Sequence, residues 1–197
     1  MDLAEAFESQ KNAIHKGGDE DWQQGASWRS ITMTNAIYRV IMRWAKSAAL
    51  KRFEENLPES QVGSRQGRSP YLATMALQAK VSRMVHDRRK AHLALLDVKN
   101  AFSSLPIPLL IETVRRIGVA QNIFDLLAKS LYSGNTTING TGEKFRPSSG
   151  VKQGCPMAGF VFTAVYSILQ KELENEGIFH VAFVDDIAIV AGSWKEL

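Results

Sequence analysis

Two adjacent carboxylates lie between two apolar stretches near the C-terminal end of the sequence. Asp185 and Asp186 follow the run 178–184 (IFHVAFV) and precede the run 187–191 (IAIVA). Apolar runs of this length are typical of strands that are buried by pairing, and the turn between them is then left to hold the charges. Aspartate is also common in ordinary solvated turns, so the pair alone favours that simpler interpretation.

A third carboxylate strengthens the chemical interpretation. Asp97 ends a separate apolar run at 92–98 (HLALLDV), which predicts a buried strand. An ionised carboxylate beside a core strand is costly unless it is paired or binds a cation. Three carboxylates from two strands could share divalent ions, and oxygen ligands suit Mg²⁺. Phosphoryl transfer at a nucleotide needs such a cluster, because one bound metal ion polarises the attacking 3′-hydroxyl and the other supports the leaving pyrophosphate.

The elements that must position these carboxylates are mostly helical. Residues 1–27 predict a helix followed by a loop, and 59–68 predict a glycine-punctuated loop. Asn139-Gly140 between two short β-prone runs predicts a hairpin. Apolar spacing and helix-end residues predict helices over 34–56, 69–90, 108–117, 121–133 and 157–174.

Composition sets outer limits on the kind of protein. The 197 residues are 45% hydrophobic and 22% charged, which is ordinary for a globular chain with one large domain or two small subdomains. No stretch approaches the roughly 20 apolar residues of a membrane span, and the first residues do not form a secretory signal. A single cysteine, Cys155, excludes an internal disulfide, favours a reducing compartment, and is interpreted as a small packing residue.

The net charge of +4 is unevenly distributed. Basic side chains are concentrated in residues 80–90, toward the end of the predicted helix 69–90. Such a cluster is typical either of a nucleic-acid-binding surface or of an ordinary solvated helix face. The cluster consists of Lys80, Arg83, His86, Arg88, Arg89 and Lys90.

Five segments resemble the polymerase motifs of reverse transcriptases, and they occur in the family's order over about residues 28–197. The segment 95–102 (LLDVKNAF) resembles motif A, and 183–186 (FVDD) resembles motif C. Between them, 149–156 (SGVKQGCP) resembles motif B of the branch that holds LINE-type non-LTR retrotransposons and group II introns. Upstream, 61–69 (QVGSRQGRS) and 28–32 (WRSIT) resemble that branch's fingers motif and its Trp-Arg-Pro-Ile segment.

The resemblance implies a metal-dependent polymerase site. Asp97, Asp185 and Asp186 would be the catalytic, metal-binding carboxylates, and the carbonyl of Val98 would be a further metal ligand. The family uses two Mg²⁺ ions at such a site, with Mn²⁺ as an alternative.

The resemblance also implies nucleotide-binding residues. Phe102 would be a steric gate under the incoming sugar, where a ring excludes the ribose 2′-hydroxyl. Gln153 and Gly154 would lie against the incoming nucleotide and the templating base, because glycine allows close backbone approach. Arg65 and Arg68 would reach the triphosphate, since the arginine fork binds phosphate oxygens bidentately. Ordinary packing for Phe102 and a solvated loop for the two arginines remain the simpler interpretations.

Several positions depart from the family pattern. Ser30 stands in place of proline, and Ser64 in place of an aromatic residue. Val184 stands where alanine is commoner, and 158–159 (Ala-Gly) replace Ser-Pro after motif B. These positions lie outside the metal chemistry, so they bear on the subfamily more than on the function.

We therefore expect an α+β fold: a right-hand polymerase palm, with an antiparallel sheet and helices on one face, and mostly helical fingers. Residues 1–27 would form an N-terminal extension and 28–91 the fingers, with part of 120–150 as a further candidate. Residues 92–197 would form the palm. The chain ends 11 residues after Asp186, so we expect the primer grip to be missing and the thumb to be absent.

The expected partners are an RNA template, a DNA primer and a deoxynucleoside triphosphate, with no membrane; the sequence does not indicate an oligomeric state. A LINE-type enzyme would work in the nucleus, and a group II intron reverse transcriptase or maturase is its close relative and a competing hypothesis. A nucleic-acid-binding remnant without catalysis and an RNA-templated RNA polymerase also stay open as hypotheses. Phe102 argues against the RNA polymerase, which usually has a small or polar group near the 2′-hydroxyl.

Overall fold

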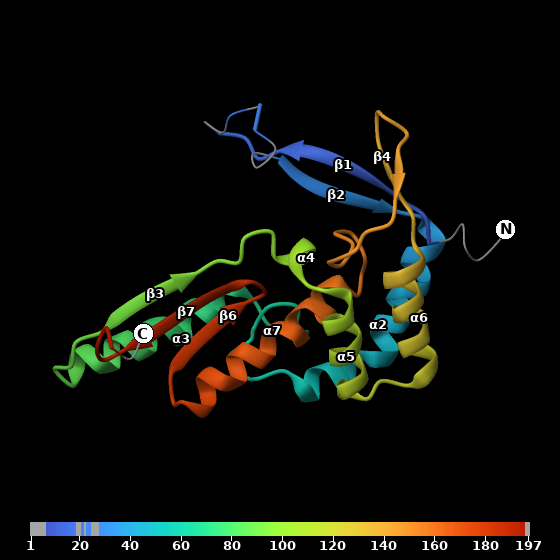
Figure 1. Ribbon diagram of the computed structural model, residues 1–197. Coiled ribbons are helices and arrows are strands. Elements are labelled where there is room, and N and C mark those ends of the chain that lie inside the picture. Colours follow the sequence, from blue (N-terminus) through green and yellow to red (C-terminus); the bar gives the residue numbers. More distant parts are fainter. Residues whose placement is uncertain (1–6, 19–20, 22, 25–27, 196–197) are drawn as a thin grey trace. The chain divides into compact units, whose positions relative to one another are not determined.

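A computed structural model describes residues 7–18, 21, 23–24 and 28–195 of the chain (Figure 1). The chain divides into two compact units, and each unit is built from two separate stretches of sequence. Unit 1 comprises residues 1–50 and 102–158, and unit 2 comprises residues 51–101 and 159–197. The helices α2 (Ala36–Asn56) and α7 (Ala158–Asn175) continue from one unit into the other. The assignment of fingers and palm to continuous ranges stays a prediction.

Unit 2 contains a three-stranded antiparallel sheet with the order β3-β7-β6. Its strands are β3 (His92–Leu96), β6 (Phe179–Phe183) and β7 (Asp186–Ala191). The two short apolar runs around the acidic turn thus pair as a hairpin, and the motif A strand adds to the outer side of β7. The predicted α+β fold with an antiparallel palm sheet is confirmed.

Helices cover this sheet unequally. Tyr166 and Leu173 of α7 pack against the face formed by Ala182, Ile187 and Ile189. The helix α3 (Pro70–His86) contacts β6 and β7, and alternate strand residues such as Val181 turn toward it. Helices therefore lie on both faces of the sheet, whereas the sequence predicted helices on one face.

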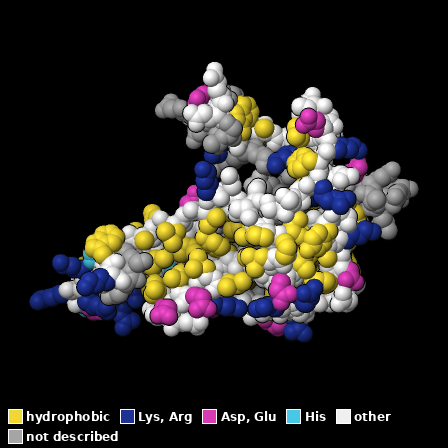
Figure 2. All heavy atoms as spheres, viewed as in Figure 1, with side chains coloured by type: hydrophobic (Ala, Val, Ile, Leu, Met, Phe, Trp, Pro, Cys, Tyr) yellow, Lys and Arg dark blue, Asp and Glu magenta, His cyan; other side chains and the backbone are white. Residues whose placement is uncertain are grey.

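The strand β3 is less buried than its apolar sequence predicted. Leu93 is 44% exposed and Leu95 is 73% exposed, because β3 is an edge strand and α3 packs mainly against β6 and β7. In Figure 2 hydrophobic side chains form a continuous field over the region of this sheet.

Unit 1 contains a second sheet, with the order β2-β1-β4-β5. The strands β1 (Ser9–His15) and β2 (Trp28–Thr34) are antiparallel, whereas β1 and β4 (Thr136–Ile138) are parallel. The prediction of a helix within residues 1–27 is therefore wrong over β1. Its backbone is held by two strands, one of them more than 100 residues away in sequence, and such pairing overrides local propensity. The rest of 1–27 lies partly outside the described residues.

The other elements of unit 1 follow the sequence closely. The helices α5 (Ile107–Ile117) and α6 (Gln121–Ser133) pack against each other, and β4 forms the predicted hairpin with β5 (Lys144–Phe145). A short helix, α4 (Ala101–Ser104), begins within the last residues of motif A and was not predicted. None of the described helices is long and apolar enough to cross a bilayer.

The basic cluster lies at the end of α3 and in the loop that leads to β3. Figure 2 shows Lys and Arg side chains gathered at that end of unit 2. Five of the six residues of the basic cluster, all except Lys80, are exposed. The ammonium of Lys80 lies 5.1 Å from the centre of the Phe179 ring. This exposure suits both a nucleic-acid surface and a solvated helix face, so nucleic-acid binding here stays a prediction.

The core of unit 1 allows a matched test of the packing of α5. Leu110 is 0% exposed and its neighbour Leu109 is 39% exposed. We expect Leu110→Ala to lower the free energy of unfolding by about 2–5 kcal/mol, because it leaves a cavity. Leu109→Ala on the same helix should cost less than about 1 kcal/mol, since much of that side chain stays in water. Urea denaturation followed by circular dichroism measures both, and equal losses would contradict the placement of α5.

Candidate active site

The register of the unit 2 sheet brings three carboxylates to one end of it. Leu96 pairs with Ile187, so Asp97 and Asp186 are the next residues at the same end of the β3–β7 ladder. Phe183 pairs with Asp186, which leaves Val184 and Asp185 as a two-residue turn. Asp97 and Asp186 are exposed and Asp185 is half-buried.

A tyrosine that the sequence analysis missed connects these three groups. The pKa of Tyr166, on α7, is raised mainly by burial, and further by the negative charges of Asp185, Asp97 and Asp186, in that order. Carboxylates disfavour the tyrosinate, so all three act electrostatically on the same hydroxyl. The sequence signals Tyr166 only weakly, as a tyrosine among the apolar residues in the first half of α7, where an aromatic ring is usually interpreted as part of the core.

The donors at this end of the sheet suit a hard divalent cation. They are carboxylate oxygens with access to water, and Mg²⁺ retains waters and takes few protein ligands. The Val98 carbonyl accepts a hydrogen bond from the Ala101 N–H at 3.2 Å, which leaves a second lone pair. As the side chains stand, no group of three acidic, histidine or cysteine residues within the described ranges is arranged to hold one ion. The metal site therefore stays a prediction.

The fingers-motif arginines are engaged with carboxylates. The Arg65 side chain is 6% exposed; its Nε donates to Glu54 at 2.7 Å and its Nη1 donates to the Pro58 carbonyl at 2.9 Å. Arg68 pairs with Glu59, and this hydrogen bond is the main cause of the lowered pKa of Glu59. A triphosphate could reach either guanidinium only by exchange with these carboxylates, and its binding there stays a prediction.

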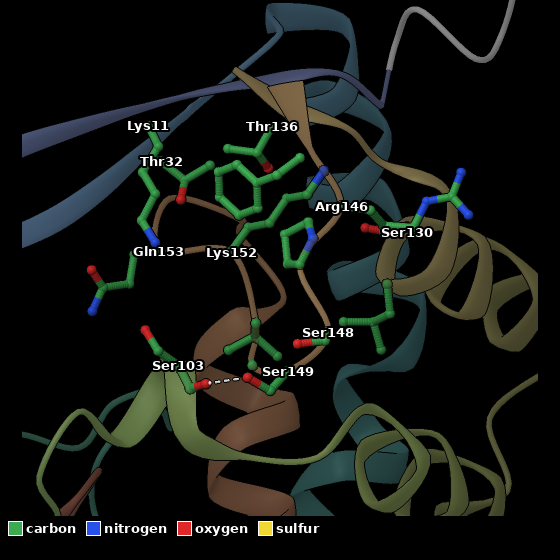
Figure 3. Close-up of a pocket in the computed structure, with 15 residues that line it drawn as sticks. Lys11, Thr32, Ser103, Ser130, Thr136, Arg146, Ser148, Ser149, Lys152 and Gln153 are labelled. Carbon is green, nitrogen blue, oxygen red and sulfur yellow. Dashed lines mark hydrogen bonds between the residues drawn. The ribbon is translucent and has the colours of Figure 1, made fainter. Parts of the chain in front are cut away.

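In unit 1 the end of motif A is fastened to motif B. The Phe102 carbonyl accepts from the Val151 N–H at 2.7 Å. The Ser149 hydroxyl donates to the Ser103 carbonyl at 2.9 Å, the interaction dashed in Figure 3. Phe102 is half-buried, and its main chain is thus fixed to the loop that carries Gln153.

Motif B is also held by the Trp-Arg-Ser-Ile-Thr strand β2. The Thr32 N–H donates to the Gln153 carbonyl at 2.9 Å. Gly154 has φ +123°, and a Cβ there would lie 2.3 Å from the Thr32 carbonyl oxygen. Only glycine allows this approach, so the structure explains the residue type at 154 without a ligand. Its contact with a nucleotide stays a prediction.

Gln153 lines a cavity of about 220 Å³ in unit 1 (Figure 3). Three of its lining residues, Lys11, Arg146 and Lys152, are basic, and Thr32, Ser103 and Ser149 are among those that add hydroxyls. Such a lining favours an anionic ligand.

Cys155, within motif B, contacts a cluster of buried hydroxyl groups. The Tyr38 hydroxyl lies 2.7 Å from the Ser130 hydroxyl and donates to the Cys155 sulfur at 3.1 Å. Burial raises the pKa of the Cys155 thiol, which disfavours the nucleophilic thiolate. These contacts support its interpretation as a packing residue.

The electrostatic link to Tyr166 can be measured directly. We expect Asp185→Asn to lower the pKa of Tyr166, because a negative charge that opposes the tyrosinate is removed. Ultraviolet titration of tyrosinate, with Tyr166→Phe subtracted to isolate this residue, reports the shift. Asp87→Asn, which neutralises a carboxylate with no such influence, is the matched control. An unchanged Tyr166 titration in Asp185→Asn would show that the turn lies elsewhere.

Comparisons with known proteins agree with this architecture. Residues 14–197 match the family model described as reverse transcriptase (RNA-dependent DNA polymerase). The R2 retrotransposon Pol polyprotein of Popillia japonica is 27% identical over 188 residues, 87% of this chain and 26% of that protein. The R2DM Pol polyprotein of Drosophila melanogaster is 33% identical over 114 residues, 52% of this chain and 11% of that protein.

Solved structures agree on the fold. Telomerase from Candida albicans, in complex with a fragment of telomeric RNA, superposes with a TM-score of 0.71 at 14% identity, over 95% of this chain and 38% of that one. Apo telomerase from Candida tropicalis, truncated from its C-terminal domain, gives a TM-score of 0.66 at 14% identity, over 97% and 45%. The chain spans about a quarter or less of the two R2 proteins. With its family model matched over nearly the whole length, the chain belongs to the reverse transcriptase (RNA-dependent DNA polymerase) family.

Proposed function

We propose that this reverse transcriptase domain adds deoxynucleotides to the 3′-hydroxyl of a DNA primer, with RNA as template, within a non-LTR retrotransposon protein of the R2 kind. The observation that carries the proposal is the shared end of the β3–β7 ladder, from which Asp97 and Asp186 leave side by side with the Val184–Asp185 turn. The named R2 relatives favour the retrotransposon branch over the group II intron branch.

In this proposal Asp97, Asp185 and Asp186 hold two Mg²⁺ ions, or Mn²⁺, with the Val98 carbonyl as an added ligand. When bound, such ions lower the pKa of the primer hydroxyl and neutralise charge on the leaving pyrophosphate. The protein contributes position, because the register of the sheet brings the three carboxylates to one end of it.

Residues of unit 1 would hold the sugar and the base of the nucleotide. Phe102 would lie under the sugar, and Gln153 and Gly154 would contact the base pair. Their support is the hydrogen bonding that joins motif A, motif B and β2 into one arrangement. Arg65 and Arg68 are proposed phosphate ligands that would exchange their glutamates for the triphosphate.

A nucleic-acid-binding remnant without catalysis is the second candidate. Two observations favour it: no three-ligand metal group is preformed among the described residues, and both fingers arginines are paired with carboxylates. The proposed nuclear location rests on the resemblance to LINE-type elements alone.

Replacing one carboxylate tests the polymerase proposal. We expect Asp185→Asn to reduce primer extension on an RNA template by about 10²-fold or more, because several kcal/mol of transition-state stabilisation are lost. Extension with Mg²⁺ and with Mn²⁺ is measured beside Asp87→Asn, a control on the exposed end of α3. Template binding without extension, the same in wild type and Asp185→Asn, would favour the remnant.

Replacing Phe102 tests sugar selection. We expect Phe102→Ala to raise the use of ribonucleotides relative to deoxynucleotides by about 10-fold or more, because the clash with the 2′-hydroxyl is relieved, a contact worth a few kcal/mol. Single-nucleotide incorporation gives kcat/KM for both sugars, with Phe124→Ala as a matched control. An unchanged ratio would leave Phe102 as a packing residue.

A further inference from the structure

The acidic turn has an unusual backbone that needs support from elsewhere. Val184 has φ +61°, in the left-handed region, although it is a β-branched residue. Its branched side chain makes this conformation a genuine outlier, and outliers of this kind persist only when surrounding contacts over-determine them. Since Val184 directly precedes Asp185, its conformation decides where that carboxylate points.

The support comes from Gln61, the first residue of the fingers motif. Its Oε1 accepts from the Val184 N–H at 3.0 Å, and its Nε2 donates to the Val184 carbonyl at 3.2 Å. The same Oε1 accepts from the Gly63 N–H at 2.8 Å, and the Gln61 side chain is 0% exposed. A single buried amide thus binds both main-chain polar groups of the strained residue.

These two hydrogen bonds fix two successive peptide planes. The Val184 N–H belongs to the planar peptide unit that leaves Phe183, and its carbonyl belongs to the unit that enters Asp185. With both planes held, the Cα of Asp185 has little rotational freedom relative to β6.

The segment that carries Gln61 is itself anchored to β6. The Val62 N–H donates to the Ala182 carbonyl, and the Ala182 N–H donates to the Ser60 carbonyl, both at 2.8 Å. Arg65 also donates to the Gln61 carbonyl at 3.4 Å from its buried site. The anchor therefore holds the main chain on both sides of the amide that meets the turn.

The backbone approaches the turn so closely that position 63 needs glycine. A Cβ on Gly63 would lie 2.3 Å from the Val184 nitrogen and 2.7 Å from its Cγ2. Main-chain atoms cannot move aside cheaply at such a distance. Gln61 and Gly63 of the fingers motif thus both contact the Val184–Asp185 turn, through Val184.

We propose that Gln61 is a positioning residue of the polymerase site, which sets the direction of Asp185 through the backbone of Val184 and thereby tunes divalent-cation binding. This inference rests on the proposed function for its catalytic consequence. The two hydrogen bonds between the Gln61 amide and the main chain of Val184, here called the clamp, are a property of the folded chain. The clamp can be measured without any metal or substrate.

The test compares two variants. Gln61→Met keeps the length of the side chain but removes its hydrogen bonds to Val184 and Gly63, and Gln66→Met is the same change at an exposed glutamine of the same loop. Amide hydrogen exchange by NMR reports the clamp directly. We expect the Val184 amide to exchange about tenfold faster in Gln61→Met, with Ile187 unchanged and Gln66→Met like wild type. Unchanged exchange at Val184 would overturn the clamp.

Terbium luminescence, with Tb³⁺ as the sole ligand and Asp185→Asn as the negative control, reports the consequence for cation binding. We expect Gln61→Met to weaken Tb³⁺ binding and to lower kcat of primer extension by about 10- to 100-fold, with little change in the KM for deoxynucleotide. A purely structural role would lower the melting temperature but leave both quantities unchanged below it. Faster Val184 exchange with wild-type Tb³⁺ affinity and kcat would therefore overturn the positioning role.

Two further variants keep the test decisive if Gln61→Met does not fold. Gln61→Glu retains the acceptor but, when ionised, turns a negative charge instead of a donor toward the Val184 carbonyl, so an effect of the same kind is expected. Gly63→Ala leaves Gln61 intact and displaces Val184 directly, so it should weaken Tb³⁺ binding as well; wild-type affinity in both would overturn the proposal. If wild-type protein shows neither Asp185-dependent Tb³⁺ binding nor extension, the proposed function fails, whereas Val184 exchange still decides whether the clamp exists.

Discussion

The antiparallel ladder between β3 and β7 is the constraint on which the candidate site depends. Side chains alternate along a strand, so a shift of the register by one residue would turn every side chain of β3 to the opposite face. Ala94 would leave the core that it now shares with Ile187 and Ile189, and Asp97 would no longer leave the sheet beside Asp186. Hydrophobic burial and the placement of the carboxylates are thus secured by the same pairing.

That pairing gathers three carboxylates at one end of a small sheet. All three carboxylates raise the pKa of Tyr166. Its neutral hydroxyl can donate a hydrogen bond to a carboxylate without adding a charge. Like charges at the end of a small sheet repel one another, so the arrangement is least costly with a cation or with water around it. Exposure of Asp97 and Asp186 provides that access. A cation bound to these carboxylates would relieve their repulsion, so cation binding would stabilise the folded chain.

The sequence predicted those features that depend on local pattern. Strands around Asp185, the hairpin at Asn139-Gly140 and the helices of unit 1 each have a periodic or turn signal within a few residues. It could not predict β1, whose strand conformation comes from pairing with β2 and with the distant β4. The exposure of Leu95 was missed for a related reason, since an apolar run does not reveal whether its strand lies at an edge.

Side-chain roles were harder to predict than elements because they depend on which partner lies within reach. Arg65 and Arg68 have the chemistry to bind phosphate, yet Glu54 and Glu59 already satisfy it within the same unit. Gln61 carried no prediction, although its amide meets Val184, which is 123 residues away. A motif that is short in sequence can therefore act on another motif through main-chain atoms. Backbone geometry therefore restricts the residue types at positions 61 and 63, and Gly63 leaves open the space that the side chain of Val184 occupies.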